Sequence, residues 1–177
     1  MDDRIATGPR PDAPAWRPLV LRTSGNVTEA IYGLILATSV IAVSREYEST
    51  DAGLIGLSVL VTAVVFWLAH VYARTLGIGL SHHAGPTRSQ TRDLLRHDWP
   101  IVEVTIPLLL LLALGAVGVV ADRTAVLVAM LSALAELAAT GAYAARVQGA
   151  GIAATILSAA VAAGLGAAVV LLKVLVH

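Results

Sequence analysis

Four ionisable side chains lie inside long apolar runs of the sequence, where an ionised group facing lipid is costly, by about 2.5–3.5 kcal/mol at the centre of a membrane helix. Such residues usually face the interior of a helix bundle and mark the path of an ion or a proton. We expect them to form the functional site: Glu29, His70, Glu103 and Glu136. Polar side chains that would support the site are Tyr32, Tyr72, Thr105, Ser132 and Thr140.

Three of the four share one depth in the membrane. At about 1.5 Å of rise per residue, Glu29, His70 and Glu103 each lie within about a turn of the cytoplasmic end of their apolar run. Two carboxylates and one imidazole are the ligands of a divalent cation such as Mn²⁺, Fe²⁺ or Zn²⁺. They are equally the parts of a proton relay. The sequence therefore predicts a site for a divalent metal, as substrate rather than as resident cofactor, or for a proton.

Each residue also has an ordinary structural explanation. Glu29 follows Asn26 by three residues, the spacing of a capping box, and Glu103 can be a first-turn acid favoured by the helix dipole. His70 can simply hydrogen-bond to a neighbouring helix. Glu136 lies in mid-helix and has no such explanation, so it has to be protonated, paired or hydrated.

The elements that position these residues are apolar helices. The chain has 177 residues, of which 57% are hydrophobic and 14% charged, whereas soluble domains carry about 25% charged residues. Continuous apolar runs of roughly 20 residues are typical of membrane helices, since barrel strands alternate in polarity. The predicted fold is an all-α polytopic membrane helix bundle with about five transmembrane helices: Val27 to Ser44, Gly53 to Ala73, Pro100 to Ala121, Thr124 to Ala145, and Ile152 to Val176.

Short polar and glycine-containing links join the later helices. Asp122-Arg123 is the expected hairpin between the third and fourth helices, and Gly149 with Gly151 supplies the turn before the fifth. Small residues spaced four apart let helices approach closely. We expect two such faces to pack inside the bundle, or alternatively to form a homodimer: Ala160, Gly164 and Ala168 on one face, and Gly141 and Ala145 on the other.

Basic residues orient the chain. The first 26 residues are polar, contain four prolines and lack the apolar stretch of a secretory signal, so we interpret them as a cytoplasmic tail. Residues 27–176 then form a single transmembrane domain with a cytoplasmic loop at about 75–99. Nine of the twelve basic residues lie on one side, which predicts a cytoplasmic N-terminus and an external C-terminus. The three basic residues on the outer side are Arg45, Arg123 and Lys173.

The cytoplasmic loop contains a segment with amphipathic character. The run from Ser89 to Trp99 predicts a short surface helix whose leucines and tryptophan touch lipid while its arginines meet anionic headgroups. A solvated loop is the alternative. The pair His82-His83 is consistent with metal pickup or with an ordinary solvated loop.

Several function classes lack support. A formal net charge of zero argues against a nucleic-acid partner, and the absence of cysteine excludes disulfides and thiolate metal sites. The sequence contains no P-loop, no dinucleotide-binding glycine pattern, no HExxH and no GxSxG motif. We therefore expect that the protein is not an enzyme.

The last two helices resemble the vacuolar iron transporter family, also called the Ccc1-like family. The resemblance rests on the run from Gly141 to Gly149 and on the Gly/Ala-rich helix through Gly164 and Gly166. It implies a five-helix transporter of divalent metal. The family's Asp-Gly pair in the first helix and its glutamate-rich loop have no counterpart in this chain. The segment from Phe66 to Ala73 also resembles actinobacterial integral membrane proteins of unassigned activity.

Together these features predict a small multi-pass protein of a bacterial plasma membrane that transports or conducts a small cation, either a divalent metal or a proton. The rival hypothesis is a non-transporting accessory or structural membrane protein. In that case the buried acids only lock helices together.

Overall fold

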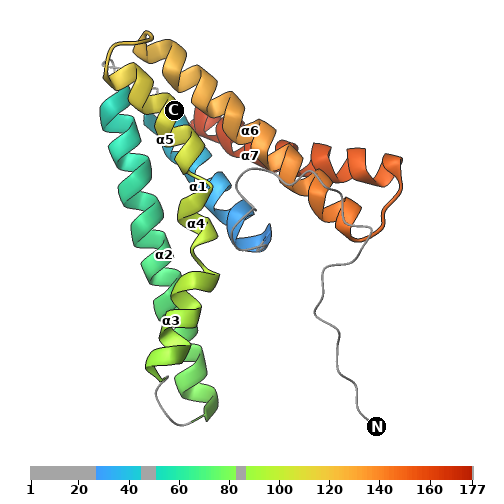
Figure 1. Ribbon diagram of the computed structural model, residues 1–177. Helices are drawn as coiled ribbons and strands as arrows, with labels where there is room; N and C mark the ends of the chain where they lie inside the picture. Colours follow the sequence, from blue (N-terminus) through green and yellow to red (C-terminus); the bar gives the residue numbers. More distant parts are fainter. Residues whose placement is uncertain (1–26, 45–50, 83–86, 177) are drawn as a thin grey trace.

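The computed structural model describes residues 27–44, 51–82 and 87–176, and within these ranges it contains helices and no strand (Figure 1). The helices are α1 (Val27–Ser44), α2 (Ala52–His82), α3 (Arg88–His97), α4 (Pro100–Glu103), α5 (Ile106–Ala116), α6 (Asp122–Val147) and α7 (Ile152–Val176). The all-α prediction is confirmed. The predicted ranges for the first and last spanning helices coincide with α1 and α7.

Within the described ranges, four helices are long and apolar enough to cross a membrane: α1, α2, α6 and α7. The segments Arg88–Glu103 and Ile106–Ala116 form a fifth, bent candidate. Large apolar side chains on these helices point outward, as shown by Leu110, Leu131 and Leu157, each more than half exposed. Because water would not tolerate so much apolar surface, the helices belong in lipid.

The core forms around α1, which contacts α2, α4, α6 and α7. Leu34 and Ile41 of α1 are fully buried, as are Leu108 and Leu112 of α5 and Leu137 of α6. Gly33 lets α1 approach α4 closely, because a Cβ at this position would overlap the backbone carbonyl oxygen of Ile101 in α4. The close contact brings the start of α1 next to the start of α4.

α2 is longer than predicted. It continues past Ala73 to His82, and its 31 residues span about 46 Å, which exceeds the hydrocarbon thickness of about 30 Å. Its last turns run beside α3, at the lower end of Figure 1. The predicted surface helix is present as α3, which starts with a capping box formed by Thr87 and Gln90.

The third predicted span is not one continuous helix. α4 and α5 are separated at Val104 and Thr105, and the two parts of the span are bent by 46°. Pro107 lacks the N–H that would bond the carbonyl of Glu103, so a regular α-helix cannot continue through this point. Thr105 instead bonds back to the carbonyl of Val102 through both its N–H (3.0 Å) and its hydroxyl (2.8 Å).

The predicted hairpin at Asp122-Arg123 is wrong, because α6 begins at Asp122 and the link is 117–121. α5 therefore ends at Ala116 rather than at Ala121. Gly118 terminates it with a φ of 75°, and Gly149 ends α6 in the same way with a φ of 77°. In both turns the next residue bonds back to a carbonyl five positions earlier, as in a Schellman motif.

One small-residue face packs as predicted and the other does not. Gly141 is buried against α7, where the Ser158 hydroxyl donates to its carbonyl at 2.8 Å. The Ala160, Gly164 and Ala168 face is exposed instead. α7 approaches α6 through Ala162 and Gly166, which lie on its opposite side. The expectation that the first face packs inside the bundle is therefore wrong.

Candidate metal centre

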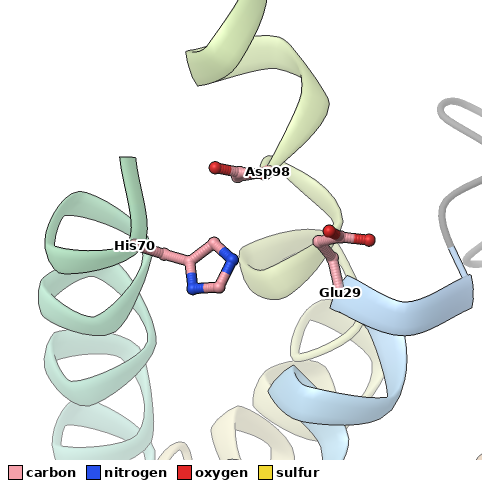
Figure 2. Close-up of side chains that lie close together, drawn as sticks. All are labelled: Glu29, His70 and Asp98. Atoms are coloured by element: carbon pink, nitrogen blue, oxygen red, sulfur yellow. The ribbon is translucent and has the colours of Figure 1, made fainter. Parts of the chain in front are cut away.

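Three side chains from three separate elements converge at one end of the bundle: Glu29 of α1, His70 of α2, and Asp98 in the link between α3 and α4 (Figure 2). One ligand atom from each residue lies within 4.8 Å of the other two. Glu29 and Asp98 are buried, and His70 is half-buried. Two carboxylate oxygens and an imidazole nitrogen are therefore close enough to share one cation after small side-chain movements.

The first two residues are placed by the packing of their helices. Glu29 lies in the first turn of α1, one turn before Gly33, so the tight α1–α4 contact carries its carboxylate toward Asp98. His70 lies on α2, and its ring centroid is 6.1 Å from that of Phe66, one turn earlier. The ring therefore lies near Phe66 of its own helix, with a nitrogen within 4.8 Å of an oxygen of each carboxylate.

Asp98 is placed by a tight turn between two helices. The N–H of Asp98 donates to the carbonyl of Leu94 at 3.0 Å, and its carbonyl accepts from the N–H of Ile101 at 3.1 Å. The same residue therefore hydrogen-bonds to the end of α3 and to the start of α4. Trp67 of α2 holds this turn, because its indole N–H donates to the carbonyl of Leu95 at 3.2 Å. Its ring also packs edge-on against Trp99, with centroids 5.4 Å apart. The turn is thereby fixed to the helix that carries His70.

A guanidinium partly balances the charge. Arg74, one turn after His70, places Nη2 2.6 Å from Oε1 of Glu29 and Nε 3.5 Å from Oδ1 of Asp98. The second distance is an ion pair without a hydrogen bond. His97 places Nε2 3.9 Å from the same Glu29 oxygen. Three basic side chains therefore surround two buried carboxylates.

Carboxylate oxygens remain unsatisfied despite these neighbours. In the described part of the chain, Oε2 of Glu29 and both carboxylate oxygens of Asp98 are buried and have no hydrogen-bond partner. A buried acceptor without a partner costs about 1–3 kcal/mol, and more for a charged group. A bound cation would remove this cost, because carboxylate oxygens are ligands for divalent metals.

The sequence prediction is partly met in this region. Glu29 and His70 come together as expected, but Asp98 joins them where we expected Glu103, which lies half-buried on α4 outside this group. Sequence reasoning passed over Asp98 because it lies in a polar loop. One feature of the sequence could have indicated Asp98. It lies two residues before Pro100, at the point where the chain has to change direction between a surface helix and a spanning helix.

Glu136 lies apart from this group, in the middle of α6. It is half-buried, it is hydrogen-bonded by Ser132, and its Oε2 atom is buried without a hydrogen-bond partner among the described residues. Glu136 therefore lies in the middle of a spanning helix with a hydrogen bond from Ser132, and its part in an ion path stays a prediction.

The other predicted polar residues do not gather at the site. Tyr32 and Tyr72 are 50% and 64% exposed, so they lie on the outer surface. Thr105 donates its hydroxyl hydrogen bond to the carbonyl of Val102 at the helix break, and Thr140 is buried within α6. Of the histidine pair predicted to lie in a loop, His82 is the last residue of α2, and His83 lies outside the described residues.

An open cavity of about 340 Å³ adjoins the group between α2 and α3. Arg74 and His97 line it together with the exposed acid Asp93. Gln90 adds a polar side chain to its wall, and Ile78 and Leu94 complete the lining. Arg74 therefore touches both the carboxylate group on one side and a polar cavity on the other.

The fold and the buried acids define the chain as a multi-span helical membrane protein with a group of residues able to bind metal. Comparisons with protein-family models, curated proteins and solved structures found no match. The resemblance to the vacuolar iron transporter family stays a prediction from the sequence.

Proposed function

We propose that this protein transports or conducts a divalent cation, which it binds between Glu29, His70 and Asp98. The observation that supports this proposal is the convergence of three metal-ligating atoms within 4.8 Å. Carboxylate oxygens buried there have no hydrogen-bond partner in the described part of the chain. A cation is the natural partner for such oxygens. The ion is the substrate of the protein, and its membrane is a bacterial plasma membrane.

The depth of the site supports exchange with one side of the membrane. His70 lies 18 residues after the start of α2, which corresponds to about 27 Å along the helix. The hydrocarbon layer is about 30 Å thick, so the site lies near its boundary, on the side where α3 lies. An ion could enter there from water without crossing lipid.

The ligand set favours a borderline divalent ion. Two carboxylates and one imidazole suit Mn²⁺, Fe²⁺ or Zn²⁺, whereas Mg²⁺ and Ca²⁺ take oxygen ligands and copper(I) prefers sulfur. The chain has no cysteine to supply sulfur. We therefore choose Mn²⁺ as the probe, because its binding is measured directly from the loss of the free-ion signal in electron paramagnetic resonance.

One observation favours the alternative, a structural protein whose acids lock helices. Arg74 ties α2 to Glu29 of α1 and lies 3.5 Å from Asp98. If this is its only role, breaking the ion pair should lower the stability of the protein, because Glu29 would be left buried without its cationic partner, and no metal should bind.

The test measures Mn²⁺ binding and Mn²⁺ flux of the full chain in lipid. We expect Glu29→Gln, His70→Gln and Asp98→Asn each to weaken binding by at least ~10-fold and to abolish flux, because each removes one ligand. Glu103→Gln is the matched control, since this acid lies outside the group, and it should bind Mn²⁺ normally. Wild-type protein that binds no Mn²⁺ would rule out the proposal. Normal binding without flux would restrict the function to metal binding.

A further inference from the structure

The strongest feature left unexplained by metal binding is Arg74, a cation that already holds the proposed ligands. We infer that Arg74 is a tethered counter-ion that competes with the metal ion for Glu29 and Asp98, and that it swings toward Asp93 when the ion binds. This inference rests on the proposed function, and it makes Arg74 a residue that determines which ions the site accepts.

The competition follows from shared atoms. Nη2 of Arg74 lies 2.6 Å from Oε1 of Glu29, and Nε lies 3.5 Å from Oδ1 of Asp98. A metal ion that binds these two carboxylates would lie within a few ångströms of the guanidinium. Like charges at that separation repel each other, and the burial of both carboxylates strengthens the repulsion. The guanidinium and the metal ion therefore exclude each other.

Charge balance gives the exchange a direction. The two carboxylates carry two negative charges, and the guanidinium neutralises one of them. A divalent ion neutralises both after Arg74 has left, whereas a monovalent ion only replaces one positive charge by another. Competition with Arg74 therefore makes the site bind Mn²⁺ in preference to Na⁺ or K⁺.

The structure offers the displaced side chain a place to go. Arg74 and Asp93 line the same cavity of about 340 Å³, and Gln90 supplies a further polar group there. The Arg74 side chain is 36% exposed, so part of it already faces this open cavity rather than packed atoms. It can change rotamers into this cavity while α2 and His70 keep their positions.

The test compares Mn²⁺ affinity in the full-length wild type, Arg74→Gln, Arg74→Lys, Asp93→Asn and the Arg74→Gln/Asp93→Asn double variant, all in lipid nanodiscs. We expect Arg74→Gln to bind Mn²⁺ at least ~10-fold more tightly and to lose this gain in 100 mM Na⁺. Asp93→Asn should weaken binding several-fold in the wild-type background but not in the Arg74→Gln background. This non-additivity is what a double-mutant cycle measures.

Equal or weaker binding by a folded Arg74→Gln variant overturns the inference. If that variant does not fold, Arg74→Lys and Asp93→Asn decide. Lysine keeps the charge without the planar fork, so tighter binding by Arg74→Lys supports competition, and unchanged binding by Asp93→Asn opposes it. Failure of the metal site itself is distinguishable, because then neither Glu29→Gln nor Asp98→Asn alters Mn²⁺ binding.

Discussion

Glu29 and Asp98 are 3% and 0% exposed, yet three of their four carboxylate oxygens have no hydrogen-bond partner among the described residues. A purely structural ion pair would be expected to satisfy its oxygens, since an unpaired buried charge is strongly destabilising. Carboxylates that lack part of their hydrogen bonds are what we expect at a site where a metal ion replaces Arg74. The residues that matter most at this scale are those that keep the carboxylates near His70.

Gly33 is one such residue. Gly33→Ala would place a methyl group against the backbone carbonyl oxygen of Ile101, so α1 and α4 would have to separate. Overpacking of this kind costs about 1–3 kcal/mol. We expect a lower melting temperature and Mn²⁺ binding weakened several-fold, because Glu29 lies one turn away. Gly79→Ala is the control, since no described atom lies within 4 Å of its added Cβ. Wild-type behaviour of Gly33→Ala would contradict the tight α1–α4 contact.

Substitution of Glu136 tests whether Mn²⁺ binding and Mn²⁺ transport depend on different residues. The metal-binding group contains no residue of α6, so Glu136→Gln should leave Mn²⁺ affinity within about twofold of wild type. We expect flux to fall strongly, because an acid in the middle of a spanning helix usually marks an ion path. Folding should be preserved, since Gln keeps the size and the bond to Ser132. Normal flux in proteoliposomes would assign Glu136 a role outside transport.

The helices determine whether these residues can meet. α3 is short and mostly exposed, and its N-terminus depends on Thr87, whose side chain accepts from the N–H of Gln90 while Gln90 bonds back to the N–H of Thr87. A ten-residue helix is marginal in isolation. Asp98 follows the other end of α3, so the N-terminal cap helps to position Asp98 by stabilising the helix.

Thr87→Ala removes this cap and should destabilise α3 by about 1 kcal/mol. Hydrogen exchange of α3 amides should become about fivefold faster, and Mn²⁺ binding should weaken by up to the same factor because Asp98 is positioned less often. Thr87→Ser keeps the capping oxygen and should behave as wild type. Equal protection of α3 in both variants would show that Trp67 alone holds the helix.

At the scale of the whole molecule, the break at Val104 and Thr105 leaves two topologies open. The bent pair can form one span or a re-entrant segment that returns to its own side. Five spans agree with the basic residues, nine of which then lie inside. The site would face the cytoplasm.

Reporter fusions at four positions test this topology. We expect cytoplasmic signals after Ser89 and external signals after Arg45, after Arg123 and at His177. The pair Ser89 and Arg123 is the critical comparison, because both flank the bent segment. Signals from the same side at these two positions would mean a re-entrant segment and four spans.

A homodimer is the second expectation at this scale. The Ala160, Gly164 and Ala168 face of α7 is exposed in the monomer, and small residues of this spacing let two helices approach closely. We expect wild-type protein in nanodiscs to show twice the mass of one chain, and Gly164→Leu to show one. A monomeric wild type would leave this face in contact with lipid.

The sequence alone determined the class of the molecule. Apolar runs of about 20 residues with few charges can only be satisfied as helices in lipid, and this requirement is local. For the same reason the sequence placed Glu29 and His70 at one depth, because depth follows from counting along a helix. The glycine that ends α6 was also readable, since a left-handed turn favours glycine wherever it occurs.

Only the tertiary structure decided which residues complete the site. Glu103 and Asp98 lie five residues apart, and counting favoured the acid inside the apolar run. The structure groups Asp98 with Glu29 and His70, because the turn at Pro100 and the bond from Trp67 fold the end of α3 over α2. The pairing of Arg74 with Glu29 likewise joins residues 45 positions apart. Such contacts depend on helix rotation and packing, which no single helix encodes.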